Sequence, residues 1–278
     1  MKYRIQTYAE LADWKRKALP FLREKEGWNN LFWQIIENRE KTSNRGWSGN
    51  VFCDGSIRLC GLHTPSNYLL LSQGDIPGVE ALAKYSIRKK WCLQGVSGPE
   101  SVVKHYLECR ERLGAKSQSS TIRSFKLFQT CNSDESLKFE DYNLSPVSSI
   151  DWARARVWAQ QFALEADPPM DISAITQMAK QMHTSKNLFM LTNPQNHPCA
   201  MAGFGRSTDR YRIINMLYVP KELRGLGLGE ELITRMTFYA RDLGYDDCLL
   251  FSEWKGGHNL YVRMGCKNLG KFAEYDLA

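Results

Sequence analysis

The sequence predicts an α+β (α/β) protein built from two lobes, and three observations support this. The chain has 278 residues, more than the roughly 100 to 200 residues of a typical single domain. Apolar residues make up 43% and charged residues 24% of it, which is near the average for globular proteins and enough to build a core. Segments of helical periodicity alternate with short strand-like runs, which indicates helices and strands sharing a core.

The first half of the chain is expected to contain four helices and four strands. Asp54-Gly55 is a hairpin signal between two of the strands, and Pro99 lies in the first turn of the last helix, where proline is tolerated. The expected helices are 8–26, 28–38, 78–90 and 99–113, and the expected strands are 49–54, 57–63, 91–96 and 122–130.

The second half follows a polar, turn-rich stretch at 131–149, which predicts a linker at 136–148 between domains 1–135 and 149–278. Asp167-Pro168-Pro169 ends the first helix of this half, and Asn193-Pro194 turns the chain between two strands. The expected helices are 149–166, 172–183, 227–243 and 258–264, and the expected strands are 188–192, 198–205, 212–219 and 247–252.

Composition excludes several classes of protein. No apolar run approaches the roughly 18 residues that span a bilayer, so the sequence excludes a membrane protein. The segment 1–6 runs quickly into charged residues and offers no secretory signal, so we expect a cytoplasmic protein. The eight cysteines include no Cys-x-x-Cys pair and are expected to be reduced. Cys53, Cys60 and His63 lack a second ligand pair, so no metal site is predicted.

The formal charge of +7 is concentrated in one segment. Residues 81–131 hold ten Lys or Arg against three Glu, while the rest of the chain is neutral on balance. Such a stretch is typical of a solvated helix face, which is our interpretation. The alternative is attraction of a polyanion, such as nucleic acid or a phosphorylated cofactor.

The most specific motif lies at 219–229, between an expected strand and a long helix. Gly225, Gly227 and Gly229 leave backbone N–H groups unshielded at a positively polarised helix N-terminus, which is suited to an anion. A Walker loop would end in Gly-Lys-Ser/Thr, but Glu230-Glu231 follows here. A dinucleotide fingerprint would need glycine at 230 or 232, and neither residue is glycine.

This segment resembles the acyl-coenzyme-A loop of the GNAT N-acetyltransferase superfamily. The pattern Gln/Arg-x-x-Gly-x-Gly/Ala is met by Arg224, Gly227 and Gly229, and residues 260–266 resemble the downstream Leu-Tyr-x-x-x-Gly-Phe motif, with Cys266 in place of the aromatic residue. The resemblance implies two lobes, each with a mixed, mostly antiparallel sheet flanked by helices and a splayed central strand pair. It also implies an acyl-CoA-dependent N-acyltransferase.

The resemblance further implies acetyl-CoA as cosubstrate. Its pantetheine arm would pair with the splayed strand, at Leu217, Tyr218 and Val219, in the manner of an added strand. Its pyrophosphate would lie on the backbone amides of the loop. These amides belong to Arg224, Gly225, Leu226, Gly227, Leu228 and Gly229.

The implied reaction is direct attack of an amine on the thioester. Tyr261 occupies the family's general-acid position and would donate to the leaving sulfur. Many relatives place a glutamate base on the splayed strand, whereas this strand carries no carboxylate, so Glu253, Glu165 and His258 are the candidates. A second departure is Trp254, which stands where the family often has asparagine.

The first half contains a faint echo of the loop at 94–99. Gln94 is present, but Ser97 and Pro99 replace the two glycines, and proline has no N–H to offer. The whole chain resembles tandem GNAT proteins in which one lobe is degenerate, so we expect catalysis in the second half and shaping of the acceptor cleft by the first.

The expected acceptor is a small-molecule or peptide amine. A membrane partner is excluded, nucleic acid is not expected, and a homodimer is left open. The alternative of another class is a non-catalytic coenzyme-A sensor or polyanion-binding protein, favoured by the basic segment 81–131 and the missing strand glutamate.

Overall fold

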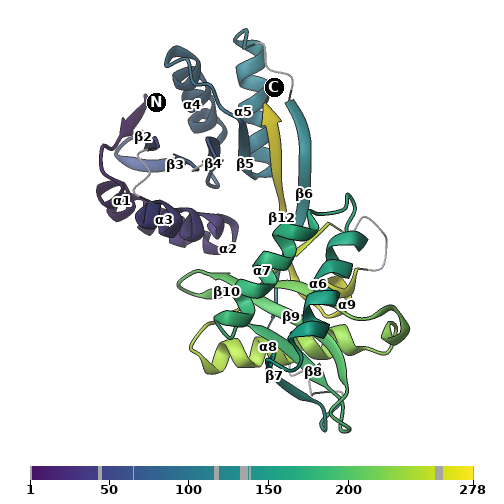
Figure 1. Ribbon diagram of the computed structural model, residues 1–278. Helices are drawn as coiled ribbons and strands as arrows, with labels where there is room; N and C mark the ends of the chain where they lie inside the picture. Colours follow the sequence, from purple (N-terminus) through teal and green to yellow (C-terminus); the bar gives the residue numbers. More distant parts are fainter. Residues whose placement is uncertain are drawn as a thin grey trace. The chain divides into compact units, whose positions relative to one another are not determined.

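The chain folds into two compact units (Figure 1). The computed structural model describes residues 2–42, 46–64, 66–115, 119–131, 137, 139–253 and 259–277. One unit comprises Met1–Leu127 and Leu269–Ala278, and the other comprises Phe128–Asn268. The C-terminal residues therefore belong to the first unit rather than to the second, and the division differs from the expected domains 1–135 and 149–278.

The first unit is a mixed sheet with five helices. Its strand order is β1-β2-β3-β4-β5-β12-β6, and β4 and β5 run parallel, with helix α4 between them along the chain. The helices are α1 (Leu11–Glu24), α2 (Glu26–Asn29), α3 (Leu31–Thr42), α4 (Ile76–Arg88) and α5 (Glu100–Arg112). The strands are β1 (Tyr3–Thr7), β2 (Ser48–Cys53), β3 (Ser56–His63), β4 (Tyr68–Leu71), β5 (Gly95–Pro99), β6 (Ser119–Gln129) and β12 (Lys267–Leu277).

The sheet of the second unit also combines one parallel strand pair with several antiparallel strand pairs. Its strand order is β11-β10-β9-β8-β7, and β10 and β11 run parallel, with helix α8 between them along the chain. The helices are α6 (Trp152–Glu165), α7 (Ile172–Thr184), α8 (Leu228–Asp242) and α9 (Leu260–Arg263), with a short 3-10 turn, η1, at Lys221–Leu223. The strands are β7 (Asn143–Pro146), β8 (Leu188–Thr192), β9 (Pro198–Ser207), β10 (Tyr211–Tyr218) and β11 (Asp247–Ser252).

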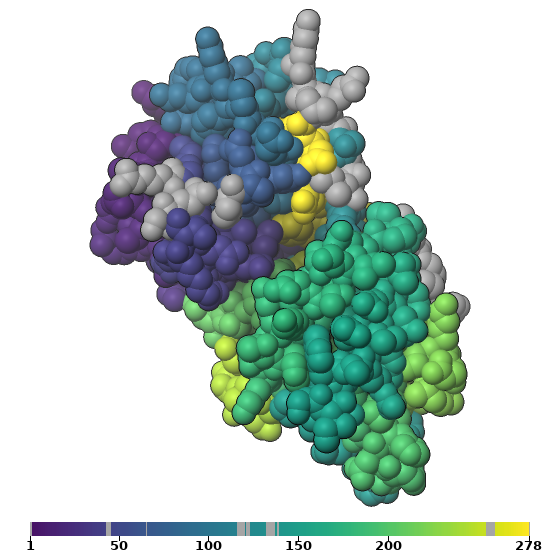
Figure 2. All heavy atoms as spheres, in the orientation of Figure 1, coloured from purple at the N-terminus to yellow at the C-terminus, as the bar shows by residue number. Residues whose placement is uncertain are grey.

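Both faces of the sheet in the second unit are buried. Along β8, Phe189 and Leu191 pack into the cluster beneath α8, while Leu188 and Met190 pack into the cluster beneath α6 and α7. The two helices α6 and α7 cover the face turned to the viewer in Figures 1 and 2. A strand that buries successive side chains on opposite faces is apolar throughout, which explains why 188–191 reads as a continuous apolar run.

The α+β class is confirmed, and the expected helices and strands of the second half appear with small changes at their ends. The sequence interpretation missed the strands β1, β4, β7 and β12. Strand β7 lies inside the segment expected to be a linker, where it pairs with β8 from Asn143↔Thr192 to Pro146↔Phe189. All eight cysteines are free thiols, as expected.

The expected second loop at 94–99 is wrong. Gly95–Pro99 is the fully buried strand β5, which pairs with β4 on one side and with β12 on the other. Its backbone groups take part in these two ladders, so it is a central strand rather than a loop. The expected strand at 91–96 is correspondingly shifted toward the C-terminus.

Among the described residues, the structure contains no helix that is both long enough and apolar enough to cross a bilayer.

Candidate active site

Strands β10 and β11 separate halfway along their length. Their parallel ladder runs from Tyr211↔Asp247 to Ile214↔Leu250, and β10 then continues for four more residues, to Tyr218. Its register with β9 is irregular over the same stretch, where Met216 adopts a φ of +53°. Such a bulge turns the strand away from its neighbour. The second half of β10, which includes Leu217, is therefore the splayed strand that the resemblance implies.

The glycine loop follows the splayed strand and is exposed. Gly225 and Gly227 have φ values of +82° and +84°, in the left-handed region that favours glycine. A Cβ atom at Gly225 would meet nothing within 4 Å, and one at Gly227 would meet only the Phe139 ring, at 3.8 Å. Backbone conformation, rather than lack of space within the chain, therefore explains these glycines. The space beside both glycines is open and could accommodate a ligand.

The backbone amides of this loop are available. Arg224 N donates to Lys221 O, and the first amide bonded inside α8 is that of Glu231, which donates to Gly227 O. Between them, the amides of 225–229 have no hydrogen-bond partner within the part of the chain that the structure describes. Five consecutive free N–H groups at the positive end of a 15-residue helix form a site suited to an anion.

Glu165 lies beside this loop, in a network of polar groups. Arg224 donates from Nη2 to Glu165 Oε2 at 2.6 Å and from Nε to Val219 O at 2.9 Å. The Tyr218 hydroxyl donates to Gln161 Oε1 at 2.8 Å and lies 3.3 Å from Glu165 Oε1. Burial and the adjacent carboxylate raise the pKa of Tyr218. Both oxygens of Glu165 therefore have partners, and the carboxylate holds Arg224 against the end of the splayed strand.

Tyr261 lies in the single-turn helix α9, packed against the core beneath α8. Its ring meets that of Phe128 edge to face, with centroids 5.4 Å apart. Desolvation of the hydroxyl, with a smaller contribution from Cys266, raises the pKa of Tyr261 above its usual value of 10. The phenol therefore keeps its proton across the physiological range. A Cβ on Gly229 would lie 3.3 Å from Leu260, so α9 packs directly against the start of α8.

Asn259 positions Tyr261 and was missed by the sequence interpretation. Its Oδ1 accepts from Tyr261 N at 2.8 Å, and its Nδ2 donates to Ser252 Oγ, at the end of β11, at 2.9 Å. Only 6% of Asn259 is exposed. An asparagine directly before a short apolar helix is a recognisable capping signal, and it could have been found from the sequence.

We expect Asn259→Ala to lower the free energy of unfolding by about 1 kcal/mol, since a helix cap is lost, and to lower kcat because α9 is no longer tied to β11. Urea denaturation and steady-state kinetics measure the two effects. Asp171→Ala is the matched control, because Asp171 caps α7 through Ala174 N at 2.6 Å. It should cost similar stability without changing kcat; an equal loss of kcat in both variants would contradict a positioning role for Asn259.

Of the other candidate residues, Glu253 directly follows β11 and is half-buried. It adjoins Ser252, the partner of Asn259, so it lies at the same edge of the sheet as α9. His258 and Trp254 lie outside the described residues.

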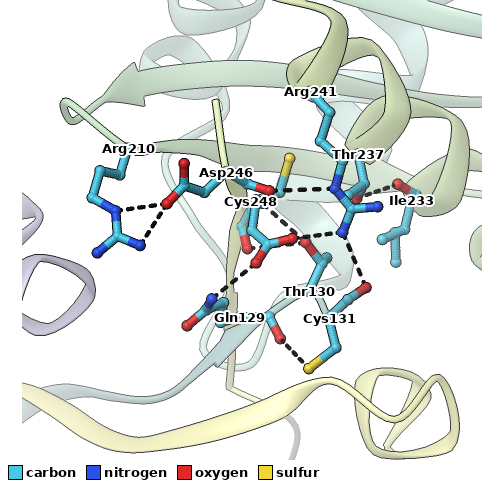
Figure 3. A network of polar contacts seen from close by, with 10 residues as sticks. Gln129, Thr130, Cys131, Arg210, Ile233, Thr237, Arg241, Asp246 and Cys248 are labelled. Carbon is cyan, nitrogen blue, oxygen red and sulfur yellow. Dashed lines mark hydrogen bonds and ion pairs between the residues drawn. The ribbon is translucent and has the colours of Figure 1, made fainter. Parts of the chain in front are cut away.

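A partly buried ion pair fixes β11 at its other end (Figure 3). Arg241, in the last turn of α8, donates to Asp247 Oδ1 at 2.7 Å and to Cys131 O at 3.1 Å, and Gln129 donates to Asp247 Oδ2 at 2.9 Å. A small surface hollow adjoins Arg241 and Cys131. It lies along the C-terminal half of α8, so it is separate from the glycine loop at the helix N-terminus.

Comparison with known proteins agrees with this geometry. Residues 151–266 match the acetyltransferase (GNAT) family. Among solved structures, an acetyltransferase of the GNAT family from Colwellia psychrerythraea is 13% identical, with 99% of each chain covered and a TM-score of 0.56. A GCN5-related N-acetyltransferase from Sphaerobacter thermophilus is also 13% identical, with 98% of this chain and 94% of that one covered and a TM-score of 0.61.

No curated protein matches the sequence. At 13% identity, the solved structures show only a shared fold. The family match covers the segment that carries both motifs and the splayed strand. Residues 151–266 therefore form a domain of the acetyltransferase (GNAT) family.

Proposed function

We propose that the second unit transfers an acetyl group from acetyl-CoA to an amine by direct attack. The observation that carries this proposal is the row of five amides at 225–229, for which the described residues offer no hydrogen-bond partner. This row lies next to a strand whose second half has left its parallel neighbour. Hydrogen bonds to a charged acceptor are about twice as strong as neutral ones, so this row suits a diphosphate. The family match over the same residues supports an acetyl donor in particular.

The backbone around the loop fits coenzyme A in two respects. The free edge of β10 at Leu217, Tyr218 and Val219 offers main-chain groups to the amide groups of the pantetheine arm. The amides of Gly225, Leu226, Gly227, Leu228 and Gly229 would hold the pyrophosphate. The amide of Arg224, which the sequence interpretation included, already donates to Lys221 O. Positive side chains also surround the loop, with Lys221 73% and Arg224 44% exposed.

Acetyl-CoA supplies a thioester, and the side chains of the second unit would guide its aminolysis. An alkyl amine with a pKa of about 10.4 is only about 0.04% neutral at pH 7, so a base or a desolvated pocket must remove its proton. A main-chain amide from 217–219 would polarise the carbonyl. The protonated Tyr261 would then donate to the sulfur as the carbon–sulfur bond breaks.

The two candidate carboxylates would have different roles. Glu165 has Arg224 on one oxygen and Tyr218 on the other, which suits a residue that positions the cofactor loop. Glu253 lies at the end of β11, next to the residue that anchors α9, which suits the general base. The base would act on the amine directly or through a water molecule.

Glu253→Gln should therefore lower kcat/KM by about 100-fold and remove the acid limb of its pH profile, because a general base typically contributes 10²- to 10⁴-fold. Glu165→Gln should instead raise KM for acetyl-CoA and keep the acid limb. Full pH profiles of kcat and kcat/KM for both variants separate the roles. If Glu165→Gln alone removes the acid limb, the assignments are reversed.

We also propose that the first unit lacks a cofactor loop of this kind. Helix α4 connects the parallel strands β4 and β5, and its second residue, Pro77, has no N–H. The amide of Gly78 already donates to Asp75 Oδ1 at 2.8 Å. A helix N-terminus capped by a carboxylate repels a diphosphate, which supports a degenerate first lobe.

Thiol release from acetyl-CoA across a panel of small amines and peptides tests the function. Amine-dependent release supports transfer, and the amines that react give the acceptor class. Tight coenzyme-A binding without turnover on any acceptor would favour the sensor instead. A polyanion-binding protein would show affinity for nucleic acid that falls steeply with salt.

A further inference from the structure

Three side chains of different chemistry meet where helices α4 and α5 of the first unit pack together. They are Glu80 of α4 and His105 and Cys109 of α5, and one donor atom from each lies within 4.8 Å of the other two. His105 and Cys109 are four residues apart, so they share one face of α5. We propose that these three residues bind one zinc ion, a site separate from the acetyltransferase function.

The distances between the donor atoms fit a tetrahedral ion. Cys109 Sγ lies 3.8 Å from His105 Nε2, and the same nitrogen lies 3.4 Å from Glu80 Oε1. In a tetrahedral zinc site with bonds of about 2.0 to 2.3 Å, neighbouring donor atoms lie about 3.3 to 3.8 Å apart. Two of the three donor pairs therefore already have tetrahedral spacing, and the third pair, Cys109 and Glu80, lies within 4.8 Å.

The donor set favours zinc over the alkaline-earth ions. One thiolate, one imidazole and one carboxylate are ligands that zinc takes together, whereas calcium and magnesium prefer oxygen ligands throughout. Three protein ligands leave one tetrahedral position for water. Because Cys109 and Glu80 bind as anions, their charges would balance that of the ion.

An outer partner and an entry path are also present. His105 Nδ1 lies 3.9 Å from Glu108 Oε2, so a carboxylate faces the ring nitrogen that the metal would leave unused, as in many zinc sites. The Cys109 residue is only 4% exposed, but the side chains of His105 and Glu80 are 23% and 35% exposed. Helix α4 lies at the surface of the first unit (Figure 2), so an ion can enter from solvent.

Arg112 contacts two residues of this cluster. Its Nη2 donates to Cys109 Sγ at 2.9 Å and lies 3.5 Å from Glu80 Oε1. The guanidinium lies against the Cys109 sulfur and the Glu80 carboxylate. Its side chain is 64% exposed, so it can move into solvent when an ion enters. Arg112 should therefore compete with zinc, and its removal should strengthen zinc binding. If Arg112 only formed a structural salt bridge, its removal would not strengthen zinc binding.

The test is titration of the reduced, metal-free full chain with zinc against a chromophoric chelator, and with Co²⁺ as a spectroscopic probe. We expect one zinc ion per chain and, with Co²⁺, a thiolate-to-metal charge-transfer band in the near ultraviolet. Cys109→Ser should abolish the band, and Glu80→Gln should weaken zinc by more than about 100-fold, beyond what loss of an outer partner typically costs. Arg112→Gln should strengthen zinc by about 10-fold.

Cys92→Ser is the matched control, because Cys92 is an exposed free thiol of the same unit; the band should survive in it. Circular dichroism of each variant checks that the fold is retained, and Glu80→Gln serves if Cys109→Ser does not fold. Absence of stoichiometric zinc binding in the wild type, or binding unchanged in both Cys109→Ser and Glu80→Gln, overturns the proposal. All these readouts are independent of acetyl transfer.

Discussion

Gly227→Asp should abolish coenzyme-A binding while leaving the protein folded. The substitution places a carboxylate among the free amides of 225–229, where the diphosphate is expected to lie. Two like charges about 4 Å apart near a protein surface repel by about 4 kcal/mol, which corresponds to about a 1,000-fold loss of affinity. Isothermal titration calorimetry with coenzyme A measures the affinity, and thermal unfolding measures the stability.

The control for this variant must share its backbone strain. Gly227 has a φ of +84°, and Gly244, just beyond the C-terminal end of α8, has a φ of +88°. A Cβ at Gly244 would also meet nothing within 4 Å. Gly244→Asp should therefore cost comparable stability, about 1 to 2 kcal/mol, without changing the affinity. Unchanged affinity in Gly227→Asp would show that the loop does not hold the cofactor.

Tyr261→Phe should lower kcat by about 100-fold or more, since a positioned acid typically contributes 10²- to 10⁴-fold, and should change the affinity for acetyl-CoA little. The ring would keep its edge-to-face contact with Phe128, so only the hydroxyl is lost. Because burial raises the pKa of Tyr261, the wild-type phenol stays protonated to beyond pH 10. The kcat of the wild type should therefore not fall through ionisation of Tyr261 at any pH below about 10.

Steady-state kinetics and coenzyme-A titration of the same preparation separate the two effects. Tyr239→Phe is a suitable control, because it removes a hydroxyl from a ring of α8 that packs against Phe189 and Phe204 instead of Phe128. A wild-type kcat in Tyr261→Phe would exclude its role as the acid. A parallel loss of affinity would instead assign the hydroxyl to cofactor binding.

The sequence could predict those parts of the candidate site that depend on residues close together along the chain. The glycines of 225–229, the helix behind them and the short helix at Tyr261 are encoded within a few residues of one another, so spacing alone locates them. The sequence also gives Arg224 as part of the loop. Its pairing with Glu165, 59 residues earlier, depends on how α6 packs against β10, which no local pattern reports.

Long-range pairing explains what the sequence could not predict. Strand β12 carries polar residues and glycine at 267–271 and does not alternate cleanly, yet it pairs with β5 from Phe272↔Pro99 to Asp276↔Gly95. The same pairing converts 95–99 from an apparent loop into a central strand. The cluster of Glu80, His105 and Cys109 likewise depends on the packing of α4 against α5. A search for ligand spacing along the chain therefore finds only Cys53, Cys60 and His63, from which no metal site is predicted.

The assignment of residues 269–278 to the first unit has a consequence for synthesis of the chain. A ribosome makes all of Phe128–Asn268 before it makes the strand that completes the N-terminal sheet. Strand β5 consequently has one edge without β12 until Phe272–Asp276 have been made. During translation the second unit can reach its native state first, and the first unit, although begun earlier, is completed only after it.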